Sequence, residues 1–148
     1  MEYLKPEVKE HYQVSVLPCT EAEFELVKDH IQVLELDDRE LKVDEFLVLK
    51  ANNELLGFGR IREFETFSEM CSMGVLEKGR ELGFGSVLVR ALAKKAKQSV
   101  YLACIIPNYF RLHGFKECEQ FPARMQDKLD YCTEHLTVPE TYVVMCSS

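Results

Sequence analysis

The sequence predicts an α/β fold in which a mixed β-sheet carries helices on its faces. Segments with the two-residue alternation of strands take turns along the chain with segments of helical periodicity. The 148 residues are enough for one continuous hydrophobic core, so we expect a single domain over residues 1–148. Hydrophobic residues make up 47% of the chain and charged residues 29%, which is ordinary for a globular protein.

The first part of the chain predicts a strand followed by a helix. Residues 13–17 alternate valines with other side chains, which indicates a strand. Thr20 and Glu23 have the spacing of a capping box, so a helix is expected to start after Thr20. Its core-facing residues are expected to be Ala22, Phe24, Leu26, Val27 and Ile31. A short second helix is expected over residues 37–41.

The next part of the chain predicts three strands. Residues 45–50 and 54–64 are rich in strand-forming side chains and flank the turn signal Asn52-Asn53, which favours a hairpin. Residues 69–76 form a third, apolar-rich strand in this interpretation.

The second half of the chain predicts helices and strands in alternation. Apolar residues recur at helical spacing in residues 83–97, and lysines in the last turns suit the helix dipole. Pro107 is tolerated in the first turn of a helix, and Gly114 is suited to end one. The other expected elements are strands at 99–106, 115–119 and 141–145, a short helix at 107–113, and partial helix within 121–138. The predicted order is β-α-β-β-β-α-β-α-β-(α)-β.

Charge and composition exclude some classes of function. Eighteen basic and twenty-five acidic residues give a net charge of -7, which disfavours broad binding to nucleic acid phosphates. No apolar run approaches the length of a membrane span, and the first residues contain no apolar signal segment. We therefore expect a cytoplasmic protein that acts on small molecules, without a nucleic acid or membrane partner.

The six cysteines do not form a recognisable metal or disulfide pattern. No two of them stand in a C-x-x-C pair. A zinc site from His113, Cys118, Cys132 and His135 is conceivable, but the spacing fits no common pattern. We expect reduced, mostly buried thiols and no metal.

The segment Arg80-Glu81-Leu82-Gly83-Phe84-Gly85 is typical of an anion site. It follows a predicted strand and opens a helix, whose first amides point outward and whose dipole adds positive potential. Glycines let the chain approach a ligand closely, and an arginine can bind phosphate in a bidentate manner. The alternative is that the glycines serve only a tight turn. The P-loop and dinucleotide-binding patterns are both absent.

Two segments resemble the motifs of the GNAT N-acetyltransferase family. Residues 69–75 (EMCSMGV) and 80–85 (RELGFG) are similar to its acetyl-CoA motif, a strand ending in valine followed by a glycine-rich turn that opens a helix. Residues 108–115 (NYFRLHGF) are similar to its second motif, a short helix ending in Gly-Phe. The resemblance implies a mostly antiparallel sheet with helices on both faces and acetyl-CoA as the acetyl donor.

The resemblance also implies roles for matched positions. The pantetheine arm would lie along Met73, Gly74 and Val75, and the pyrophosphate would lie on the turn, with the thiol end of the cofactor beside Asn108 and Phe110. The residues expected at the pyrophosphate are Arg80, Glu81, Leu82, Gly83, Phe84, Gly85 and Ser86. Three positions depart from the family pattern: Glu77 stands where proline usually follows the strand, Glu81 stands where glycine is usual, and Phe110 stands where a tyrosine often serves as general acid.

The implied chemistry is direct transfer of the acetyl group to a primary amine. Glu69 is the candidate general base and Tyr109 the candidate acid, with an exposed carboxylate and a packing aromatic as the respective alternatives. Arg60 and Arg62 share one face of a predicted strand and could hold a substrate carboxylate. The alternative for both arginines is a solvated strand end paired with nearby glutamates.

The carboxy-terminal part resembles a narrower group. Residues 128–132 and 140–145 are similar to the tail of N-acetylglutamate synthase-type domains and their stand-alone relatives, which often also carry phenylalanine at the position of Phe110. The hypothesis is an amino-acid N-acetyltransferase, monomeric or homodimeric. The alternatives are a transferase acting on another small amine or on protein, and an acyl-CoA-binding module with impaired catalysis.

Overall fold

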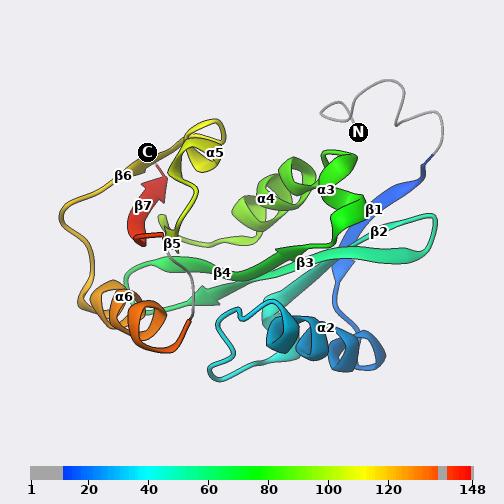
Figure 1. Ribbon diagram of the computed structural model, residues 1–148, viewed down its shortest axis with the longest axis horizontal. Helices are drawn as coiled ribbons and strands as arrows, with labels where there is room; N and C mark the ends of the chain where they lie inside the picture. The colour runs from blue at the N-terminus through cyan, green and yellow to red at the C-terminus, as the bar shows by residue number, and fades with distance from the viewer. Residues whose placement is uncertain (1–11, 137–139, 148) are drawn as a thin grey trace.

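A seven-stranded sheet with helices on both faces forms the computed structural model, which describes residues 12–136 and 140–147 (Figure 1). The strands are β1 (Val14–Pro18), β2 (Phe46–Ala51), β3 (Glu54–Glu63), β4 (Ser68–Val75), β5 (Val100–Cys104), β6 (Phe115–Glu117) and β7 (Val143–Ser147). The helices are α2 (Glu21–Val33), α3 (Glu77–Glu81), α4 (Phe84–Lys95), α5 (Pro107–Arg111) and α6 (Ala123–His135), with a 3-10 turn η1 at Val43–Glu45.

The sheet is mixed and mostly antiparallel, as the sequence predicts. Its strand order is β1-β2-β3-β4-β5-β7-β6. The pairs β1–β2, β2–β3, β3–β4, β5–β7 and β6–β7 are antiparallel, whereas β4 and β5 run parallel. The parallel pair results from the crossover through α4, because two parallel strands cannot be joined by a short hairpin.

Helices cover the two faces of this sheet separately. Figure 1 shows α3, α4 and α5 on one side and α2 and α6 on the other. On the first side Phe84 and Leu88 of α4 are fully buried in the main hydrophobic cluster. On the second side Ile31 of α2 packs with Phe46 and Phe58. Burial of apolar side chains against both faces is the main stabilising contribution to such a layered fold.

The two central strands diverge. Pairing between β4 and β5 is confined to Ser68 with Val100 and Glu69 with Tyr101. A bulge then interrupts the β3–β4 ladder, and Ser72 within it has a φ of 52°. Bulges bend a strand away from its partner. The carboxy-terminal half of β4 therefore borders an opening toward β5 in place of a paired strand.

The structure confirms most expected elements and corrects several details. The Thr20–Glu23 capping box is present. Residues 37–41 form no helix and contain a turn at residues 39–40, because the Asp37 side chain accepts a hydrogen bond from the Arg39 amide. Ala22 and Leu26 of α2 are exposed, since the buried stripe runs through Val27 and Ile31. The structure adds α3, which the sequence interpretation omitted.

No helix in the described part of the chain is long and apolar enough to cross a membrane. The thiols of all six cysteines are free. In the same described part, the group of side chains close enough to share a metal ion is Asp37, Glu69 and Cys71, and the four residues considered for zinc do not form such a group.

Candidate active site

Two adjoining cavities open where β4 and β5 diverge. The outer cavity, of about 460 Å³, is lined by Leu34, Leu36, Met73, Gly74, Val75, Arg80, Gly83, Gly85, Ser86, Ile106 and Tyr109. The inner cavity, of about 390 Å³, shares Leu34, Leu36, Met73, Arg80 and Ile106 with it and continues to Met70, Cys71, Ser72, Leu102, Cys104, Ile105, Phe110, Lys128 and Tyr142. A long ligand could therefore run from the start of α4 into the space between the two strands.

The start of α4 offers free backbone donors to the outer cavity. Gly83 precedes the helix with a φ of 78°, a conformation that favours glycine. The amides of Leu82 and Gly83 donate to carbonyl groups of α3 at 3.2 Å each. No side chain caps α4, so the amides of residues 84–86 are the orphan donors of its first turn. Of the residues 80–86 predicted to form the anion site, residues 84–86 therefore provide its free backbone amides.

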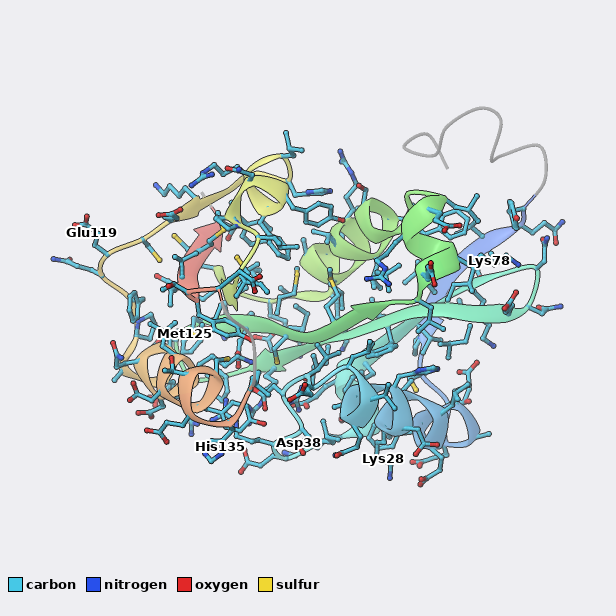
Figure 2. All side chains as sticks on the ribbon, in the orientation of Figure 1. Lys28, Asp38, Lys78, Glu119, Met125 and His135 are labelled. Carbon is cyan, nitrogen blue, oxygen red and sulfur yellow. The ribbon has the colours of Figure 1, made fainter. Side chains whose placement is uncertain are left out.

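The side chains around the turn differ in their access to the cavities. Arg80 lines both cavities. Lys78 extends from α3 toward the start of β3 and binds Glu54 at 3.0 Å (Figure 2). Glu81 is exposed and is not among the residues that line either cavity. The Glu81 carboxylate is therefore directed to solvent and not into either cavity, although a glycine would be usual at this position.

The hydroxyl of Tyr109 lies beside Gly85 at the start of α4. An ideal Cβ on Gly85 would stand 2.6 Å from this hydroxyl. Burial raises the pKa of the Tyr109 phenol, and a hydrogen bond with the side chain of Ser86 opposes the rise. The predicted role of Tyr109 as the acid at the thiol is not supported by this position, because its hydroxyl points back toward the turn.

Replacing Gly85 by alanine is expected to displace Tyr109 and to weaken acetyl-CoA binding about tenfold. The new methyl group would overlap the phenolic oxygen, and the ring would have to move within the outer cavity. Isothermal titration with acetyl-CoA measures the effect. The double variant Gly85→Ala, Tyr109→Phe is the control, since loss of the hydroxyl removes the overlap; unchanged binding by Gly85→Ala alone would contradict this arrangement.

The two residues expected beside the thiol lie in different environments. Phe110 is buried among core residues and forms part of the inner cavity wall. The side chain of Asn108 binds that of Arg111 in the same short helix and does not line either cavity. Phe110 therefore faces the inner cavity, whereas the Asn108 side chain binds within its own helix.

Glu69 is buried in an ion-pair network and is not an exposed carboxylate. Its Oε2 atom lies 3.1 Å from the Nζ atom of Lys128, which also donates to Asp37 at 2.6 Å. No described residue forms a directed hydrogen bond with Glu69 Oε2, so the contact with Lys128 is electrostatic. Among the described residues, Asp37, Glu69 and Cys71 are close enough to share a metal ion, and the Lys128 ammonium pairs with both carboxylates of this group.

Asp37, in the loop after α2, binds Arg39 of the same loop and Lys128 of α6. Arg39 binds it through two nitrogens, at 3.0 and 2.8 Å. Burial acts to raise the pKa of Asp37, but Arg39 and Lys128 hold it well below its usual range. Burial likewise acts to lower the pKa of Lys128, while Cys71, Glu69 and Asp37 keep it above its usual range. Both groups are therefore charged at neutral pH.

A second contact ties the same loop to α6. The hydroxyl of Tyr131 donates to Asp38 at 2.9 Å, and Asp38 lies between α2 and α6 (Figure 2). Because Leu34 and Leu36 of this loop line both cavities, these contacts fix one wall of the candidate site.

Arg60 and Arg62 are bound by protein groups. Arg60 is fully buried and donates to Ser72, to Glu45 and to the carbonyl oxygens of residues 39 and 40. Arg62 is 7% exposed, donates to Glu40 at 2.6 Å and packs over Phe64. Neither arginine lines the inner or the outer cavity. Their predicted role in holding a substrate is therefore not supported by the geometry.

A helix start with free amides beside two diverging parallel strands defines a site for a long phosphate-bearing cofactor, of the kind used by acyltransferases. The sequence identifies the family: residues 8–118, more than half of the chain, match the model of the acetyltransferase (GNAT) family. The chain belongs to this family, and acetyl-CoA is its acetyl donor.

Solved structures share the fold at low sequence identity. N-acetylglutamate synthase from Neisseria gonorrhoeae, complexed with coenzyme A and N-acetyl-glutamate, superimposes with a TM-score of 0.72 at 14% identity over 91% of this chain. The present chain covers 35% of that protein, about a third of its length. Rv2747 from Mycobacterium tuberculosis, in complex with CoA and NLQ, has a TM-score of 0.72 at 17% identity and is covered to 98%, with 90% of this chain aligned.

A third similar structure holds a bisubstrate analogue. Arabidopsis thaliana Naa50, in complex with the bisubstrate analogue CoA-Ac-MVNAL, has a TM-score of 0.64 at 16% identity, over 91% of this chain and 98% of that one. No curated protein matches the sequence significantly. These likenesses concern the fold, and the nature of the acceptor has to be argued from the cavity.

Proposed function

We propose that this acetyltransferase moves the acetyl group directly from acetyl-CoA to the primary amine of a small acceptor, and that free L-amino acids with apolar side chains are its acceptors. The observation that carries the proposal is the inner cavity, where the thioester end of the cofactor would meet the acceptor. Its walls are mostly aliphatic and aromatic, with Leu34, Leu36, Met70, Leu102, Ile105, Ile106 and Phe110.

The buried charges near this cavity favour an acceptor with an uncharged side chain. Lys128 lies between Asp37 and Glu69, and Arg39 binds Asp37, so the ammonium is already neutralised. A second carboxylate on the acceptor would find no unpaired buried cation in the described cavity wall. Only Arg80 at the mouth is available to an α-carboxylate. The complex of N-acetylglutamate synthase with N-acetyl-glutamate supports an amino-acid acceptor by analogy of fold alone.

Direct transfer is favoured over an acyl-enzyme because the thiols at the cavity are inactive. Cys71, Cys104 and Cys132 line it. Burial raises the pKa of each, that of Cys71 to about 11, so all three remain protonated near neutral pH. A thiol is a poor nucleophile compared with its thiolate. In this proposal the amine attacks the thioester, its proton passes to solvent, and Glu69 holds Lys128 in place.

The proposal is tested with purified protein, acetyl-CoA and a panel of free L-amino acids, amines and short peptides. CoA release is measured with a thiol reagent and the product by mass spectrometry. We expect N-acetylation of L-leucine and L-methionine at a kcat/KM at least about tenfold above that of L-glutamate, the size expected when a charge enters an apolar pocket. Preference for L-glutamate or for a peptide amino terminus would refute the acceptor class.

A further inference from the structure

The inner cavity contains a phenol that the family motif does not account for. At the position where a tyrosine could donate a proton, the chain has Phe110, which has none to give. Tyr109, its neighbour, directs its hydroxyl to Gly85 at the start of α4. Among the described residues that line the inner cavity, the phenol is that of Tyr142, which lies immediately before β7.

The register of the sheet places Tyr142 beside the unpaired end of β5. β7 runs antiparallel to β5, and Val143 pairs with Cys104, the last residue of β5. Tyr142 therefore lies one residue beyond the end of β5. At this end β5 has no pairing with β4, because their ladder stops at Tyr101. The inner cavity reaches this unpaired end of β5, where Cys104, Ile105 and Tyr142 all line it.

Several charged and titratable groups influence the pKa of the Tyr142 phenol. Lys128 and Cys132 come from α6, Glu35 from the loop after α2, and Glu140 from its own segment. Burial raises the pKa of the phenol, Cys132 adds to the rise, and the Lys128 ammonium opposes it. No residue in the described ranges forms a hydrogen bond with the hydroxyl, so its proton is not committed to the protein.

We infer that Tyr142 is the general acid of this acetyltransferase, donating its phenolic proton to the sulfur of CoA. The inference rests on direct transfer as proposed above. The amine nitrogen bonds to the thioester carbon, the carbon–sulfur bond breaks with its electron pair on sulfur, and the phenolic proton moves to that sulfur to give the thiol. The phenolate regains a proton from solvent, while the amine loses one to solvent.

Hydroxylamine is the acceptor that isolates this step. It is largely unprotonated at neutral pH, so its attack on acetyl-CoA needs no general base, and acetohydroxamate is quantified with ferric ion. Its small size makes the result independent of which amine the cavity prefers. The variant Tyr142→Phe is expected to lower kcat at saturating acetyl-CoA by at least about tenfold. The Kd of CoA and the melting temperature are expected to stay unchanged. In wild type kcat is expected to fall at alkaline pH as the phenol loses its proton, and in Tyr142→Phe this fall is expected to disappear.

Two matched tyrosine variants serve as controls. Tyr109→Phe is expected to keep kcat at saturating acetyl-CoA and the fall of kcat at alkaline pH. Tyr101 lies on β5 and packs on Phe67, and Tyr101→Phe is expected to have the kcat and pH dependence of wild type. The inference is overturned if Tyr142→Phe keeps both the wild-type kcat and its fall at alkaline pH. It is also overturned if Tyr109→Phe loses them instead, or if wild type acetylates hydroxylamine no faster than the uncatalysed reaction. Turnover of hydroxylamine without turnover of L-leucine would refute the acceptor class and leave the role of Tyr142 intact.

Discussion

Replacing Gly83 by aspartate is expected to weaken acetyl-CoA binding by about a hundredfold. The residue stands directly before the free amides of α4, and its φ of 78° is costly for most side chains. A carboxylate there would also face the two negative charges of the pyrophosphate. Repulsion from both charges in a solvent-exposed site costs about 2 kcal/mol. Isothermal titration with acetyl-CoA measures the loss of affinity.

Gly83→Asn is the matched control for this prediction. Asparagine has the same shape as aspartate and tolerates a left-handed backbone, but it carries no charge. We expect it to bind acetyl-CoA roughly tenfold or more tightly than the aspartate variant, with the same melting temperature. Equal affinities for the two variants would mean that no phosphate group approaches Gly83.

Replacing Lys128 by methionine is expected to lower the free energy of unfolding by about 3–5 kcal/mol, the usual cost of leaving a buried charge without its partner. Methionine fills a similar volume, but Glu69 loses the cation that faces its Oε2 atom, and Asp37 loses a 2.6 Å hydrogen bond. Denaturant unfolding at neutral pH provides the measurement.

Two further variants separate charge from packing in this network. Lys94→Met, at an exposed lysine of α4, is expected to change stability by less than about 0.5 kcal/mol. The double variant Lys128→Met, Glu69→Gln removes both charges of one pair and is expected to recover part of the loss. If Lys128→Met were as stable as wild type, the ion pairs would not hold the loop after α2 against α6.

Local features of the site could be predicted from the sequence. The free amides at the start of α4 follow from a strand, two glycines and a helix within a few residues, and the capping box at Thr20 follows from a three-residue spacing. Such features depend on neighbours along the chain, which the sequence displays directly. The mixed sheet could be predicted for the same reason, since its elements alternate in a regular order.

Long-range contacts could not be predicted in this way. Asp37 and Lys128 are 91 positions apart, and nothing in either segment indicates that they meet. The burial of Arg60 depends on carbonyl groups of a loop that the sequence interpretation took for a helix. Tyr142 reaches the cavity only because β7 pairs with β5. Each of these residues acquires its role from tertiary packing, which overrides the local pattern.

A crystal structure of the protein with CoA tests the central claim most directly. We predict that the pyrophosphate binds the amides of residues 84–86, that the pantetheine arm follows Met73 to Val75, and that the sulfur lies in the inner cavity within hydrogen-bond reach of the Tyr142 hydroxyl. A CoA molecule whose phosphates lie away from α4, or whose sulfur lies outside the opening between β4 and β5, would contradict this account.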